Sequence, residues 1–233
     1  MSDTTSNLSL PYLAAAQAQK HVTVNDSLRA LDAIVQLSVL DRDLTTPPAS
    51  PADGDRYIVG ASATGAWAGK DGQITAWQDG AWGYYEPKTG WRAWVVDEGV
   101  GLVHDGNVWS VGLAISSNLA TISLHVIEEE VTCSGASVDT TMQIPDRAIV
   151  FAVSTRTTQG LTGATSYDCG ISGDTGKYGG TLGISAGSTN SGVTGPTAYF
   201  ANTAVRLTAN GANFTGGKVR VAIQYMACGV PAS

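Results

Sequence analysis

The first regular pattern of apolar positions lies near the N-terminus. Val24, Leu28, Leu31 and Val35 recur at steps of four, three and four residues, and Ile34 widens the stripe that they form. This spacing predicts a helix with one apolar side, of the kind that pairs with other helices. A helix of this length is marginal alone in water, so the stripe needs a partner. Two partners stay open: the protein's own sheet, or copies of the chain that form a helical bundle.

The residues before the stripe predict a polar tail and a first helical stretch. Residues 1–10 are polar, and Pro11 suits the first turn of a helix because its missing N–H has no helical partner there. The Ala- and Gln-rich run that follows predicts helix up to His21. Thr23 and Asp26 fit a capping box that begins the next helix.

Residues 56–110 alternate short β-type runs with turn signals. Asp-Gly, a dipeptide that tight hairpin turns favour, occurs at 71–72, 79–80 and 105–106. The loop 86–90 contains Pro and Gly and predicts a further hairpin, which would place Trp82 and Tyr84 beside Trp91 and Ala93 on one face. We therefore predict a small antiparallel β-meander.

All six tryptophans fall in this region: Trp67, Trp77, Trp82, Trp91, Trp94 and Trp109. A meander this small has little aliphatic area, and one large aromatic side chain buries about 150–250 Å², so we interpret most of these tryptophans as core. Tyr85 and Trp94 alternate to the opposite side of their strands. They are predicted to be exposed aromatics on which a sugar or a base could stack.

From Ile122 onward the strands become longer, β-branched and poor in aromatics. In the last one, Val219, Val221, Ile223 and Tyr225 alternate with Lys218, Arg220, Ala222 and Gln224, which predicts one buried face. Several such strands with Gly-rich turns predict an antiparallel β-sandwich of the jelly-roll type. Residues 160–196 are rich in Gly, Ser, Thr and Asn and predict long loops, which are usually functional or held by a neighbouring subunit.

The predicted fold class is mainly β, with a short N-terminal α-helical segment, a small Trp-rich meander and a C-terminal sandwich. The predicted domains are an N-terminal tail and helical attachment segment (1–44), a Pro-rich linker (45–55), the Trp-rich module (56–115) and the sandwich (116–233). Consecutive prolines end the helix before the linker, because each removes a backbone donor and restricts the residue before it.

Charge and cysteine content narrow the possible partners. A formal net charge of -7 with no run of Lys or Arg argues against a protein that grips nucleic acid. The sequence shows neither a signal peptide nor an apolar run long enough to span a membrane, so we expect synthesis in the cytoplasm and no membrane insertion. Cys133, Cys169 and Cys228 are widely spaced, which predicts small buried hydrophobes rather than a zinc site.

The sequence gives little support to catalysis. The three histidines lie in different predicted elements, and no nucleophile–base pair, metal motif or phosphate loop is evident, so we expect no enzyme, no cofactor and no metal. The acidic cluster Glu128–Glu130 is interpreted as a solvated strand edge.

Carbohydrate binding is easier to support. Sugars are held by aromatic rings against their apolar faces and by polar groups against their hydroxyls. The Gly-rich tract offers both, and our candidate carbohydrate-binding residues are Tyr167, Asp168, Asp174, Lys177, Tyr178, Thr189 and Asn190. Plain surface loops remain an equally good interpretation of any one of them.

Several stretches resemble a known family. "LPYLAAAQAQKHVTVNDSLRALDAIVQL", "GDRYIV", "TGAWAGKDGQITAWQDGAWGYYEPKTGWRAWVVDEG" and "HDGNVW" closely resemble an uncharacterised domain family of alphaproteobacterial prophages and gene transfer agents. The QAQKHVTxN block and the paired GAW units carry the resemblance, which covers about residues 8–111. The remainder looks like the C-terminal part often attached in those particles. The resemblance implies a virion-associated fibre or head spike, a homotrimer, that recognises a host surface glycan such as capsule.

On this interpretation the N-terminal part serves oligomerisation and attachment to other virion proteins. The residues expected to do so are Leu28, Leu31 and Val35 in the stripe, with Gln17, Gln19, Lys20, His21 and Asn25 beside it. Two alternatives stay open: a capsule-degrading hydrolase or lyase whose carboxylates pair across subunits, and a purely structural virion adaptor.

Overall fold

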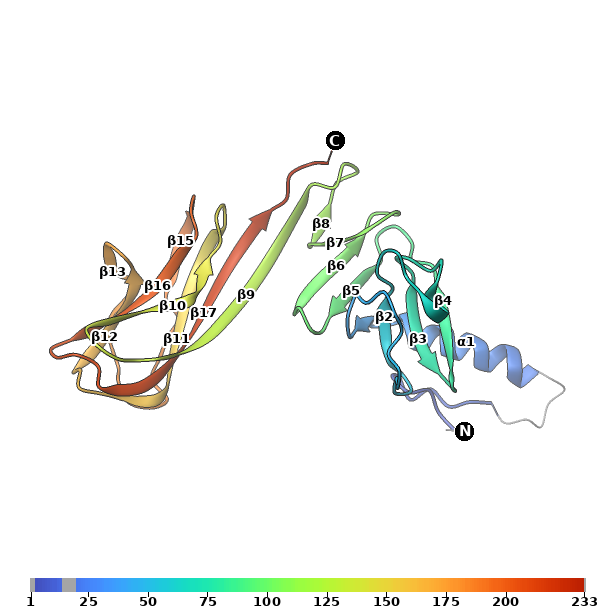
Figure 1. Ribbon diagram of the computed structural model, residues 1–233, viewed down its shortest axis with the longest axis horizontal. Coiled ribbons are helices and arrows are strands. Elements are labelled where there is room, and N and C mark those ends of the chain that lie inside the picture. Colours follow the sequence, from blue (N-terminus) through green and yellow to red (C-terminus); the bar gives the residue numbers. More distant parts are fainter. Residues whose placement is uncertain (1–2, 14–19, 233) are drawn as a thin grey trace. The chain divides into compact units, whose positions relative to one another are not determined.

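A computed structural model describes residues 3–13 and 20–232 of the chain (Figure 1). The structure is mainly β with several antiparallel sheets and one α-helix near the N-terminus, α1 (Lys20–Ile34), which confirms the predicted fold class. The chain divides into two compact units. Unit 1 comprises Met1–Thr121 with Pro231–Ser233, and unit 2 comprises Ile122–Val230.

Unit 1 contains two small sheets. One has the order β2-β3-β4, made of β2 (Arg56–Ile58), β3 (Ile74–Gln78) and β4 (Ala81–Tyr85). The other has the order β1-β5-β6-β7, made of β1 (Ser38–Val39), β5 (Arg92–Val95), β6 (Val100–His104) and β7 (Trp109–Val111). A short 3-10 helix, η1 (Gly65–Trp67), precedes β3, and the two-residue β8 (Ala114–Ile115) follows β7.

The N-terminal predictions need three corrections. Pro11 does not begin a helix but forms an antiparallel bridge with Thr4. Thr23 lies inside α1, so it caps nothing. Residues 45–55 are not a linker between compact units, because the Thr64 amide donates to the Thr45 carbonyl at 2.7 Å within unit 1. Backbone hydrogen bonds of this kind fold the Pro-rich segment onto the strands.

The hairpin predicted between residues 82–85 and 91–95 is also wrong. A turn does form, since the Trp91 amide donates to the Lys88 carbonyl at 3.0 Å, but it leads from one sheet to the other. Both edges of β5 are already occupied, by β1 in parallel and by β6 in antiparallel pairing. By contrast, the hairpin at 79–80 is confirmed: β3 pairs with β4, and Asp79 and Gly80 both have positive φ.

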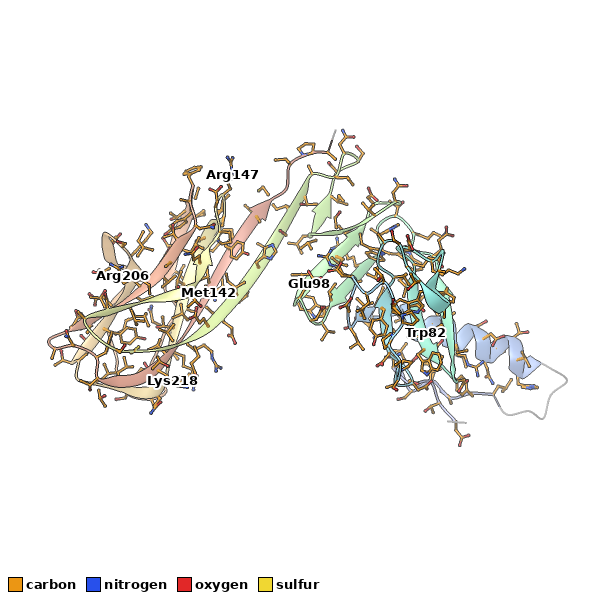
Figure 2. The ribbon with its side chains drawn as sticks, viewed as in Figure 1. Trp82, Glu98, Met142, Arg147, Arg206 and Lys218 are labelled. Carbon is orange, nitrogen blue, oxygen red and sulfur yellow. The ribbon has the colours of Figure 1, made fainter. Side chains whose placement is uncertain are left out.

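The tryptophans of unit 1 serve mainly as core, as predicted. Trp67 is fully buried, and its ring centroid lies 5.1 Å from that of Trp82 in an edge-on arrangement. Trp82 points from β4 into this cluster (Figure 2). Trp91 and Trp109 pack against the second cluster of unit 1, around Val95 and Leu102.

Unit 2 is a sandwich of two antiparallel sheets (Figure 1). Its strands are β9 (Thr121–Thr132), β10 (Ser137–Ile144), β11 (Ile149–Thr162), β12 (Ser166–Ile171), β13 (Asp174–Leu182), β14 (Thr189–Asn190), β15 (Val193–Ala198), β16 (Thr203–Asn210) and β17 (Gly216–Cys228). One sheet has the order β10-β16-β12-β13; in the other, β11 pairs with β14, β15 and β17, and β17 pairs with β9. With β14 and β15 taken as one interrupted strand, this is the jelly-roll arrangement.

The predicted alternation of apolar and polar residues in the last strand, β17, identifies the face of the sheet that forms the core. Val219, Val221, Ile223 and Tyr225 are buried between the sheets, and they pack with residues from both sheets. A face of this kind drives the two sheets together, because burial removes apolar area from water.

The Gly-rich tract 160–196 is not a set of long loops, because most of it forms strands β12 to β15. Its glycines permit close backbone approach. A Cβ at Gly170 would lie 2.1 Å from the Asp174 carbonyl oxygen, and one at Gly192 would lie 1.9 Å from that of Val153. Small residues that indicate loops in the sequence thus serve tight strand packing here.

Candidate functional site

The two tyrosines predicted to stack on sugars are core residues. Tyr167 is 1% exposed and Tyr178 is 3% exposed. The Tyr167 hydroxyl lies 2.9 Å from Thr155 Oγ1, and the Tyr178 hydroxyl is hydrogen-bonded to that of Tyr199. Burial raises the pKa of both phenols. Neither ring can contact a glycan, so these two predictions are wrong.

The predicted charged residues do not converge either. Asp168 Oδ1 accepts hydrogen bonds from the Thr181 amide at 2.7 Å and from Asn210 Nδ2 at 2.8 Å, and Thr181 has positive φ within β13. Asp174 is exposed beside the turn between β12 and β13, and Lys177 is half-buried on β13. All three lie in the β10-β16-β12-β13 sheet, whereas Thr189 and Asn190 lie on β14 of the other sheet. The two sheets meet here, because Asn190 Nδ2 donates to the Tyr178 carbonyl of β13 at 2.8 Å.

Thr189 and Asn190 do line a cleft on the other sheet. Its volume is about 380 Å³, which lies within the usual range for small-molecule sites. The lining residues are Glu128, Ser154, Thr155, Arg156, Thr189, Asn190, Ser191, Arg220 and Ala222. All belong to unit 2, so one folded unit builds the whole cleft.

Strand register explains how these residues meet. Arg156 on β11 is opposite Arg220 on β17 and opposite Thr189 on β14, and Arg220 is opposite Glu130 on β9. Residues directly opposite one another point to the same face of a sheet. Because Val219 and Val221 of β17 face the core, this row faces outward. Arg156 and Arg220 were not identified as site residues from the sequence. Arg220 belongs to the polar set that alternates with Val219 and Val221, which indicates an outward position, but the sequence does not show which strands pair.

Charge in and beside the cleft is mixed. Glu130 accepts from Lys218 Nζ at 3.0 Å and from Arg220 at 3.4 Å, and the hydrogen bond from Lys218 holds the pKa of Glu130 below its usual value. Figure 2 shows Lys218 on β17, in the other sheet from Arg206 on β16. Glu128 and Arg156 are exposed and make no ion pair within the described part of the chain.

This arrangement offers hydroxyl, amide, guanidinium and carboxylate groups at one place. Such a set can donate to and accept from the hydroxyls of a sugar. Among the described residues that line the cleft, Glu128 is the single carboxylate. Glycan hydrolysis ordinarily needs two carboxyl groups about 5–10 Å apart. The next outward carboxylate of β9, Glu130, is held by Lys218 and Arg220, so a second free carboxylate would have to come from another chain.

The exposed aromatics predicted in unit 1 are Trp94 and Tyr85. Trp94 is 49% exposed, and its register neighbours are Ser38 and Gly101, whose small side chains leave space beside the ring. It lines a second cleft of about 500 Å³ between the end of α1, β1 and β5. Tyr85 is half-buried against the core rather than exposed, with its hydroxyl 3.1 Å from Gln78 Oε1.

The stripe on α1 lies largely in solvent. Leu31 is 46% exposed, Val24 and Val35 are similarly exposed, and Leu28 is partly buried. The helix contacts the rest of unit 1 through another side, where Asp32 and Ala33 are buried. Packing on the protein's own sheet thus does not account for the stripe.

The polar residues predicted for attachment are only partly described. Gln17 and Gln19 lie outside the described residues, as does the side chain of Lys20. His21 is partly buried at the start of α1. Asn25 accepts from the Leu13 amide at 2.8 Å and donates to the Leu13 carbonyl at 3.2 Å, so it holds the preceding segment against the helix.

Other predictions from the sequence concern metal binding, membrane insertion and the cysteines. No group of three or more His, Cys, Asp or Glu side chains is placed to hold a metal ion among residues 3–13 and 20–232. None of the helices described there is both long and apolar enough to cross a bilayer. Cys133 and Cys169 are buried as predicted, whereas Cys228 is exposed.

No curated protein matches the chain. A chain of the solved structure titled "Cyanophage Pam1 capsid asymmetric unit" is 24% identical, with a TM-score of 0.35; the match covers 45% of this chain and 85% of that one. Residues 24–110 match a family described as "Protein of unknown function (DUF2793)", and the N-terminal unit is in this respect similar to that family.

Proposed function

We propose that the chain is a virion-associated spike or fibre protein of a phage or gene transfer agent that binds a host surface polysaccharide such as capsule. The virion assignment is supported by the motifs in residues 8–111, together with the family match over residues 24–110. The binding assignment is supported by the cleft around Thr189, Ser191 and Arg220 in unit 2. That cleft is the observation that carries the proposal.

The proposed protein is a homotrimer, with attachment to other virion proteins through unit 1. The exposed stripe of α1 supports self-association, because two or three helices that share such stripes bury them against one another. Host recognition is assigned to unit 2, where the polar cleft lies.

Within the cleft, Arg220 is the residue best placed to hold a sugar. Arg220 and Lys218 both donate to the carboxylate of Glu130. A guanidinium carries five N–H donors, so several N–H groups of Arg220 are left to bind ligand hydroxyls or a sugar carboxylate. Thr189 and Ser191 add hydroxyl groups at the strand edge.

Binding of the full chain to an array of purified bacterial capsular polysaccharides tests the proposal. We expect at least one glycan to bind, and Arg220→Ala to weaken that binding about tenfold, because hydrogen bonds to charged groups contribute about 1.5–3 kcal/mol. Arg206→Ala is the matched control, since Arg206 is also paired with a carboxylate but lies on the opposite sheet.

The two alternatives give different outcomes in the same experiment. No binding to any capsule glycan would contradict the proposal and favour a structural adaptor. New reducing ends or unsaturated products from a bound capsule would instead favour the capsule-degrading enzyme.

A further inference from the structure

The sheet that carries the cleft has an apolar region on the same outward face. In register, Leu124 on β9 is opposite Met226 on β17, which is opposite Ile149 on β11. One step along the strands, Val126 is opposite Gln224, Gln224 is opposite Ala152, and Ala152 is opposite Val193. We call this the apolar half-face, made of Ile122, Leu124, Val126, Ile149, Ala152, Val193, Gln224 and Met226.

The apolar half-face is unusually open to solvent for such residues. Leu124 is 58% exposed, Val126 is 68% exposed and Val193 is 79% exposed. None of its members carries a charge. Single exposed apolar residues are ordinary, but contiguous rows of them on a monomer usually mark an interaction site. The solvated face of an antiparallel sheet is ordinarily polar.

Charge at the border of the apolar half-face indicates the occupant. Glu128 continues the outward row of β9, and Arg156 continues that of β11 on the other side of β17. Both are exposed, have opposite sign and lack an ion pair within the described residues. A second copy, turned so that the β9 side of one chain meets the β11 side of the next, brings Glu128 of one chain to Arg156 of the other. A lipid surface would favour basic residues here, and the apolar half-face has none.

We infer that a second copy of this chain packs on the apolar half-face of unit 2, so that the polar cleft lies at the border between two chains. Val126 and Leu124 would lose their solvent exposure, and the partner would lie beside the cleft that unit 2 builds. This contact is separate from the α1 stripe, and it does not depend on whether the cleft binds sugar.

Photo-crosslinking of the full chain tests this directly. With Val126 replaced by p-benzoylphenylalanine, irradiation should give a covalent dimer whose crosslinked peptide lies in β11, β15 or β17 of the second chain. Thr175→p-benzoylphenylalanine is the control, because Thr175 is exposed on β13 in the opposite sheet. A Val126 adduct no stronger than that of Thr175, or one that maps to unit 1 or to added lipid vesicles, would overturn the inference.

A charge exchange tests the orientation of the two copies. Glu128→Arg alone and Arg156→Glu alone should each reduce the dimer yield of the Val126 photoprobe, and the double exchange should restore it. Leu124→Glu combined with the Val126 photoprobe should lower the yield about tenfold or more, because a charge would be buried without a partner. Circular dichroism of each variant checks that unit 2 remains folded.

The outcomes separate this inference from the proposed function. Arg220→Ala should weaken glycan binding about tenfold without changing the Val126 crosslink. If glycan binding fails and the crosslink persists, the interface stands and the receptor role falls. If the charge exchange does not restore the crosslink, the proposed pairing of Glu128 with Arg156 is wrong.

Discussion

Asp32 Oδ1 accepts a hydrogen bond from the backbone amide of Leu8 at 2.6 Å, which ties the N-terminal segment to α1. The Asn7 amide and side chain also donate to this carboxylate, at 3.0–3.1 Å. Asp32 is fully buried. Burial alone would raise its pKa, but hydrogen bonds from Thr5, Leu8 and Asn7 outweigh that effect and hold the pKa below its usual value.

Asp32→Asn should therefore destabilise unit 1 by about 1–3 kcal/mol at neutral pH, since a charged acceptor of several hydrogen bonds is lost. The folded-state pKa is depressed, so this stabilisation is present above the unfolded-state value of about 4 and is lost as the pH falls through the lower folded-state value. Urea unfolding at pH 7 and at acid pH, followed by tryptophan fluorescence, measures both effects. The fluorescence reports unit 1 alone, because all six tryptophans lie there.

The control is Asp26→Asn on the same helix, whose carboxylate is largely exposed in its ion pair with Arg29. It should cost little, since exposed pairs contribute about 0–1 kcal/mol. Equal losses for the two variants, or a loss for Asp32→Asn that persists undiminished in acid, would show that Asp32 does not anchor the N-terminal segment as described.

Truncating individual tryptophans should separate core from surface. Trp67→Ala should lower the free energy of unfolding of unit 1 by about 3–5 kcal/mol, because it leaves a cavity beside Tyr57 and Trp82. Trp94→Ala removes a ring that is half in solvent and should cost much less. Comparable urea midpoints for the two variants would contradict this assignment.

Thiol labelling should distinguish the three cysteines. Burial raises the pKa of Cys133 to about 11 and that of Cys169 to about 12, so neither forms thiolate at pH 8, whereas Cys228 is exposed. The native chain should react with Ellman's reagent at one thiol, and the denatured chain at three. Rapid reaction of a second thiol in the native chain would show that the core of unit 2 opens readily.

The strand pattern of the sequence predicted local structure well. Alternation in 218–225 marks the buried face of β17, and the Asp-Gly pair at 79–80 marks a real hairpin. Both signals depend on neighbouring residues only, so they can be interpreted without knowing the fold.

These local patterns do not predict which distant strands pair with one another. The β1–β5 parallel pair joins residues far apart in sequence, and with β6 on the other edge it leaves β5 no edge for β4. The residues of the candidate site likewise depend on strand pairing that the sequence does not reveal. Thr189 and Asn190 were found because they lie in a polar tract, but Arg156 and Arg220 join them only through the register of β11 with β14 and β17. Tyr167 and Tyr178 were misassigned because a Gly-rich strand has the composition of a loop.

The α1 stripe should be needed for assembly. Leu28→Glu with Leu31→Glu places two charges where sister helices would meet, so sedimentation velocity should show a loss of the oligomer. Val22→Glu is the matched control: Val22 is also exposed on α1, but at 100° per residue it lies on another side of the helix from Leu31. An unchanged oligomer in the double variant would show that the stripe is not a contact between chains.

Sedimentation equilibrium of the unmodified full chain tests the central claim most directly, namely that copies of this chain cover the apolar rows on α1 and on β9. The account predicts a mass of three times the chain mass of 24.0 kDa that persists on dilution. A mass of 24.0 kDa at the highest attainable concentration, with the protein folded and soluble, would contradict it.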